Sequence, residues 1–128
     1  MTATHADISY QPESNYLVVR VHTRRILDDT DATCTAIAAE FAARPIKAAL
    51  IDLREVPGPV TFMDRFNLGE AAGRLLAGTP IATLVTEEQA DPERIGKIAA
   101  RNRGANVEVF LDRDEALAWM QPYLAMQR

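Results

Sequence analysis

The sequence predicts an α/β fold: one domain with a mixed β-sheet, an N-terminal hairpin and four helices. The 128 residues suit one compact domain, since a chain of this length buries roughly two thirds of its unfolded surface. Short apolar runs alternate with segments of helical period, which is typical of parallel strands joined by crossover helices. Two runs near the N-terminus lie close together, as the strands of a hairpin do.

The first two strands are expected at 8–11 (ISYQ) and 15–22 (NYLVVRVH). The intervening residues 12–14 (PES) favour a turn, so we expect an antiparallel hairpin. In the second run, apolar residues occupy every second position from Leu17 to Val21. This alternation favours a strand near one side of the sheet.

The segment 27–45 has the apolar period of a helix. Its inward face is expected to consist of Cys34, Ile37, Ala38 and Phe41. Acidic residues at 28–31 provide capping and complement the helix dipole, and Pro45 follows the helix end. The position of Cys34 on the apolar face favours burial over nucleophilic use.

Residues 47–53 (KAALIDL) form a nearly continuous apolar run, which predicts a strand covered on both faces at the centre of the sheet. Asp52 closes this strand, at the carboxyl edge where open α/β sheets place their ligands. A carboxylate there also commonly accepts hydrogen bonds from neighbouring backbone N–H groups. Asp52 is therefore a candidate contact residue with two interpretations.

The next helix is expected from Thr61 to about Ala77, with Gly78 at its C-terminal end. Thr61 and Asp64 form a pattern that resembles a capping box. Small residues within the segment 69–78 (GEAAGRLLAG) predict that this helix lies tightly on the sheet or on a twin helix.

The chain continues with a strand at 80–86, a helix at 91–104 and a strand at 106–111. For this helix we expect Asp91 as N-cap and Pro92 at the first helical position. Its inward residues are expected to be Ile95, Ile98 and Ala99.

A last helix is expected at 112–124. Asp112 and Glu115 are placed to form a capping box at its start. Trp119 is expected to pack its ring against the sheet or the neighbouring helix.

The order of elements and four segments, LIDL, FMDRFNLG, IATLVT and VEVFLDRDEALAWM, resemble the STAS fold over residues 8–124. The closer similarity is to its SpoIIAA-like branch, grouped as STAS/SEC14. This resemblance implies a bacterial, non-enzymatic regulatory or protein-interaction module whose partner is another protein or a second copy of itself. The SEC14 side of the resemblance implies an alternative, the binding of a small apolar or amphipathic, lipid-like ligand.

The anti-sigma-factor antagonists of the STAS family carry an FMDSSGLG-like turn whose second serine is phosphorylated. That motif aligns with residues 62–69 of this chain, where Arg65 and Phe66 occupy the two serine positions. The phosphate acceptor is absent, so we expect no phosphorylation of this helix start. Thr61 is the nearby hydroxyl, and we assign it to capping.

Arg65 places a cation in the first helical turn, where it opposes the helix dipole unless an acid pairs with it. Two interpretations follow: a solvated ion pair with Glu55 or Asp64, or recognition of an acidic ligand or partner. Beside it, three apolar residues are candidate contacts for a twin chain or for a ligand at a pocket mouth, with ordinary packing as the alternative. These residues are Phe62, Met63 and Phe66.

Arg94, Lys97 and Arg101 form a basic stripe, with Arg103 just beyond. A solvated face with an ion pair from Glu93 to Lys97 is one interpretation. Binding of an acidic partner or of lipid headgroups is the other.

A net charge of −4 argues against a broad nucleic-acid surface, which needs a basic face. A single cysteine permits no intrachain disulfide, and neither a secretory signal nor an apolar run long enough to span a bilayer occurs. We therefore expect a cytoplasmic protein.

The sequence contains no nucleotide-binding, metal-binding or catalytic motif. Neither His5, in the N-terminal tail, nor His22 has the spacing of a catalytic triad. We therefore expect no enzyme and no cofactor.

Overall fold

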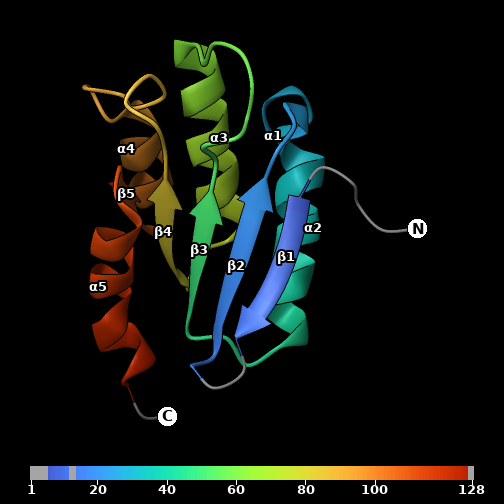
Figure 1. The fold of residues 1–128 in the computed structure, drawn as a ribbon. Coiled ribbons are helices and arrows are strands. Elements are labelled where there is room, and N and C mark those ends of the chain that lie inside the picture. Colours follow the sequence, from blue (N-terminus) through green and yellow to red (C-terminus); the bar gives the residue numbers. More distant parts are fainter. Residues whose placement is uncertain (1–5, 12–13, 127–128) are drawn as a thin grey trace.

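The computed structural model describes residues 6–11 and 14–126, and Figure 1 shows one sheet with helices on both faces. The strands are β1 (Ala6–Gln11), β2 (Tyr16–Val21), β3 (Ala48–Asp52), β4 (Pro80–Leu84) and β5 (Asn106–Phe110). The helices are α1 (Arg25–Asp28), α2 (Thr30–Ala43), α3 (Phe62–Leu75), α4 (Ile95–Asn102) and α5 (Arg113–Leu124). The expected α/β class is confirmed.

The five strands lie in the order β1-β2-β3-β4-β5. β1 and β2 pair antiparallel, whereas the pairs from β2 to β5 are parallel, so the sheet is mixed as expected. All five residues of β3 are buried, and β3 is the middle strand. Of the expected hairpin turn, Pro12 and Glu13 lie outside the described residues, as does His5.

The core has two layers because successive side chains of a strand point to opposite faces. Helices α1 to α4 cover one face, where Leu17, Ile51 and Ile81 are buried. Helix α5 covers the other face, where Leu50 and Met120 are buried.

The segment expected as one helix at 27–45 forms two helices, the single turn α1 and then α2. Asp29 separates them, with φ −139° and ψ 66°, and its side chain makes no capping hydrogen bond. The expected acidic cap is therefore wrong in detail, although Asp31 still lies in the first turn of α2. The inward face is confirmed, since Cys34 and Ile37 are buried.

Helix α3 begins with the expected capping box. The Thr61 side chain accepts a hydrogen bond from the Asp64 N–H at 3.1 Å, and the Asp64 carboxylate accepts one from the Thr61 N–H at 2.9 Å. The small residues of α3 contact α4 of the same chain. A Cβ at Gly69 would overlap the carbonyl oxygen of Gly96, and one at Gly73 would lie 2.8 Å from the carbonyl oxygen of Ala100. These glycines therefore allow α3 and α4 to pack closely.

The start expected for the third long helix, α4, is wrong. Asp91 accepts hydrogen bonds from the N–H groups of Glu93 and Ile95, at 3.0 and 2.6 Å, and so holds a separate turn. Arg94 then adopts a left-handed conformation with φ 59°, and α4 begins only at Ile95. Ile98, expected to face inward, is 49% exposed. Ile95 and Ala99, the other two residues expected to face inward, are half-buried, and Ala100 is the buried residue of α4, so the expectation is wrong for Ile98.

Helix α5 has half of its expected capping box: Asp112 accepts a hydrogen bond from the Glu115 N–H at 3.1 Å. The Trp119 ring is half-buried and packs at 5.9 Å from Phe110 and 5.2 Å from Tyr123, measured between ring centroids.

Candidate functional site

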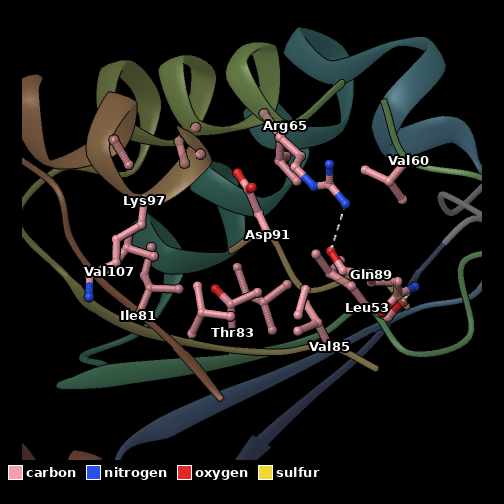
Figure 2. A pocket seen from close by; sticks show the side chains of 18 of the residues that line it. Leu53, Val60, Arg65, Ile81, Thr83, Val85, Gln89, Asp91, Lys97 and Val107 are labelled. Carbon is pink, nitrogen blue, oxygen red and sulfur yellow. Dashed lines mark hydrogen bonds between the residues drawn. The ribbon is translucent and has the colours of Figure 1, made fainter. Parts of the chain in front are cut away.

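A cavity of about 480 Å³ lies between helices α3 and α4 and the sheet. Figure 2 shows the floor of the cavity, which is formed by Ile81 and Thr83 of β4 and by Val85, just after this strand. Leu68 and Ala72 of α3 line the opposite side. The volume falls within the roughly 300–1,000 Å³ of small-molecule sites, which are also mostly apolar.

The cavity follows from the residue sizes on its two walls. Arg65, Leu68 and Ala72 stand at i, i+3 and i+7 on one face of α3, and alternation along β4 turns Thr83 to the same space. Ala72 and Thr83 are short, so the two walls do not meet. Thr83 and Ala72 are not among the residues predicted from the sequence, although the helical spacing from Arg65 points to Ala72.

Arg65 brings a positive charge to this apolar space. Figure 2 shows its guanidinium at one end of the cavity, near Val60 and Gln89. One Nη donates to the Gln89 carbonyl oxygen at 3.3 Å, whereas Nε is buried and has no hydrogen-bond partner among the described residues. Leaving a buried donor unsatisfied costs about 1–3 kcal/mol, so an acceptor placed there would be stabilising.

The Gln89 carbonyl is itself held in place by the Gln89 side chain. The side-chain amide donates to the Leu53 carbonyl oxygen at 2.7 Å, and its oxygen accepts from the Thr86 N–H at 2.9 Å. These bonds tie the loop after β4 to the end of β3. The Arg65 guanidinium is therefore positioned by a fixed part of the fold.

The ion pair expected for Arg65 is not formed. Glu55 pairs with Arg20 at 3.3 Å, and Asp64 lies 3.6 Å from Arg24. Of the arginines in the described chain, only Arg24 and Arg65 are half-buried. Arg24 lies near the carboxylates of Asp28 and Asp64, whereas Arg65 has no carboxylate partner among the described residues. The interpretation of Arg65 as a solvated ion pair is therefore wrong.

Among the other charged residues that line the cavity, Lys97 and Glu108 pair with each other, whereas Glu87 and Arg94 are exposed. Lys97 donates to Glu108 at 2.7 Å, and Arg101 donates to the same carboxylate at 3.0 Å. Burial opposes ionisation of Glu108, but the hydrogen bond and charge of Lys97, with help from Arg101, hold its pKa below the usual value. Lys97 and Arg101 therefore share one acid within the protein, and the expected pair between Glu93 and Lys97 is replaced by the pair with Glu108. Arg103 likewise pairs with Glu70, at 2.9 Å.

Asp52 is not part of the cavity. Its side chain is 7% exposed and lies on the sheet face that α5 covers. Helix α3, which contains Arg65, covers the opposite face. The carboxylate accepts three hydrogen bonds from Arg54, one from the backbone at 3.0 Å and two from the guanidinium at 3.0 and 2.9 Å. Burial alone would raise the pKa of Asp52, but these bonds and the charges of Arg54 and Arg20 lower it.

Phe62, Met63 and Phe66 form an exposed apolar patch at the start of α3, with 53%, 54% and 39% of each residue accessible. None of the three lines the cavity, so their expected place at a pocket mouth is wrong. The patch and the cavity are two separate features of the same helix.

The two remaining residues discussed from the sequence, Cys34 and His22, are buried and half-buried, respectively. Burial, followed by the charge of Asp31, raises the pKa of the Cys34 thiol to about 11, so the reactive thiolate is disfavoured at neutral pH. His22 is half-buried and lies 3.8 Å from Asp7.

No protein-family model and no curated protein sequence matches this chain. The STAS/SEC14 resemblance therefore rests on the residues quoted above. Within residues 6–11 and 14–126, no helix has the length and apolar character needed to cross a bilayer.

Proposed function

We propose that this chain is a non-enzymatic, cytoplasmic binding module that holds a small amphipathic molecule between α3, α4 and the sheet. The observation that carries this proposal is the apolar cavity of about 480 Å³ with the Arg65 guanidinium at one end. Small-molecule sites combine an apolar lining with a few placed polar groups in the same way. The SEC14 side of the resemblance supports the same function.

Burial of apolar ligand surface supplies the binding free energy, at roughly 25 cal/mol per Å² removed from water. The floor residue Thr83 and the helix residue Ala72 set the width of the site. A larger side chain at either position would occupy the space that the ligand needs.

Native mass spectrometry of protein purified from its own host tests for a retained ligand. In addition, octanol serves as a neutral apolar probe, titrated while backbone amide resonances are followed by NMR. We expect saturable shifts at Leu68, Ala72 and Thr83. The variant Thr83→Leu should abolish them, whereas Ala118→Leu, on the exposed side of α5, should not. Absence of saturable binding to the wild-type chain would refute the proposal.

A second candidate function is a regulatory contact with another protein or a second copy of the chain through Phe62, Met63 and Phe66. The specific observation is their exposure at a capped helix start. Burying one Phe side chain favours association by about 1.5–3 kcal/mol. The STAS resemblance supports this function.

The variant Phe66→Ser tests this candidate. Because Phe66 is 39% exposed, the substitution should leave the fold intact and weaken self-association or partner binding by roughly tenfold to a hundredfold. Analytical ultracentrifugation measures self-association. A wild-type chain that stays monomeric and retains no protein partner from its host would exclude this function.

A further inference from the structure

We infer that the ligand of the cavity carries a single negative charge, a carboxylate on an alkyl chain, and that Arg65 binds this head group. This inference rests on the proposed binding function and adds the chemical class of the ligand. The buried Nε of Arg65 has no acceptor within the described residues, although the neighbouring Nη has one. The edge of the guanidinium that carries Nε is thus the unsatisfied polar group of the site.

A carboxylate fits this edge because its two oxygens accept parallel hydrogen bonds from one side of a guanidinium. The bond to the Gln89 carbonyl oxygen uses one of the five N–H donors of Arg65 and fixes the orientation of the group. Since Gln89 is itself anchored to Leu53 and Thr86, the guanidinium is held in one orientation, and a carboxylate reaches the covered Nε once the side chains over it shift.

The charges around the cavity favour one negative charge over two. Glu108 forms ion pairs with Lys97 and with Arg101, and the Asp91 carboxylate accepts hydrogen bonds from the N–H groups of Glu93 and Ile95, which follow it. Arg65 is then the one lining cation that is half-buried and lacks a carboxylate partner in the described chain. A dianionic phosphate monoester would place a second negative charge beside Glu87, Asp91 and Glu108, which also line the cavity, and the other lining cation without a carboxylate partner in the described chain, Arg94, is exposed to solvent.

The remainder of the cavity accommodates an alkyl chain. Figure 2 shows Ile81, Thr83 and Val85 between the Arg65 end and the end where Lys97 and Val107 lie. A ligand with its carboxylate at Arg65 therefore places its chain along the floor formed by β4. At the far end Lys97 is paired with Glu108, so the half-buried cation without a carboxylate partner in the described chain lies at the Arg65 end, which suits a molecule with one charged end.

Isothermal titration calorimetry with octanoate, octanol and octylamine at neutral pH and low salt tests the inference. The three probes share one alkyl chain and differ in the charge of the head group. We expect the wild-type chain to bind octanoate about tenfold or more tighter than octanol, and octylamine weakest, because a charge-assisted hydrogen bond to the carboxylate is added. This comparison uses the wild-type protein alone and does not depend on the folding of any variant.

Variants assign the preference to Arg65. In Arg65→Met, which keeps the apolar stem, octanoate and octanol should bind equally, whereas Arg65→Lys should retain part of the preference for octanoate. Arg113→Met, an exposed position on α5 across the sheet, is the matched control and should behave like the wild type.

The outcomes separate the two proposals. If octanol binds as tightly as octanoate, or if Arg65→Met keeps the preference, the cavity still binds apolar molecules but the assignment of a carboxylate to Arg65 is overturned. If none of the three probes binds, both the proposed function and this inference fail.

Discussion

The Arg24 guanidinium lies 3.6 Å from the carboxylate of Asp64, and this pair joins the segment after β2 to the start of α3. Arg24 also donates to the carbonyl oxygens of Pro57 and Pro59, at 2.9 and 2.8 Å. One side chain thus holds both the loop before α3 and the acid of its capping box. The same helix start places Arg65 toward the cavity, so Arg24 supports the candidate site from outside.

We predict that Arg24→Ala lowers the free energy of unfolding by about 1–3 kcal/mol, because two hydrogen bonds to a charged group and a partly buried ion pair are lost together. The control is Arg20→Ala, whose exposed pair with Glu55 should contribute less than about 1 kcal/mol. Urea titration measures both values. Equal losses for the two variants would show that Arg24 contributes no more than a surface ion pair.

A second prediction concerns the contact between α3 and α4. A methyl group at Gly69 would overlap the Gly96 carbonyl oxygen, so Gly69→Ala should force the helices apart and cost about 1–3 kcal/mol as an overpacked substitution. Asn67→Ala, on the exposed side of α3, is the control and should change stability by less than about 0.5 kcal/mol. A stabilised Gly69→Ala variant would indicate that helix propensity outweighs the contact.

The central place of β3 in the sheet could be predicted because its sequence is almost continuously apolar, and all five of its residues are buried. The start of α4 could not be predicted from the sequence. Asp91 followed by Pro92 is compatible both with a helix cap and with a separate turn, and local sequence does not distinguish them. The left-handed conformation of Arg94 decides the outcome, and such conformations are uncommon for residues other than glycine.

The candidate site was less predictable than the fold. The sequence shows Arg65 in the first turn of a helix, but the hydrogen bond that orients its guanidinium comes from pairing with Gln89, which is 24 residues away along the chain. The nearest acids in sequence suggested an ion pair, yet Arg20 and Arg24, from the end of β2 and beyond it, pair with them instead. Contacts between distant segments thus determined the role of Arg65.

A third prediction concerns the half-buried Trp119, which packs against Phe110 and Tyr123. Full burial would make Trp119→Ala cost about 3–5 kcal/mol, and partial exposure should reduce the loss to about 2 kcal/mol. Trp119→Phe keeps an aromatic ring and should restore more than half of the lost stability. Urea unfolding followed by circular dichroism is the measurement, since fluorescence is lost with the tryptophan. A loss below about 0.5 kcal/mol would mean that the aromatic contacts contribute little.

The last prediction concerns Asp52 and the pH dependence of stability. Hydrogen bonds from Arg54 lower the pKa of Asp52 in the folded protein, so the folded state binds a proton less readily than the unfolded chain. The stabilisation is therefore fully present above the unfolded pKa of about 3.9, and is lost as the pH falls through the lower folded pKa. Asp52→Asn should lower stability at neutral pH and reduce the further loss between about pH 4 and the folded pKa.

The matched control for this prediction is Asp114→Asn, an exposed acid in the first turn of α5. It should leave the acid limb of the stability profile almost unchanged, apart from the few tenths of a kcal/mol that a helix dipole contributes. Urea titrations of the wild type and both variants across the acid range measure the slopes. If the wild type and Asp52→Asn lose stability in parallel below about pH 4, the hydrogen bonds from Arg54 do not lower the pKa of Asp52. The acid sensitivity then arises from other carboxylates, such as Glu108, whose pKa is also lowered.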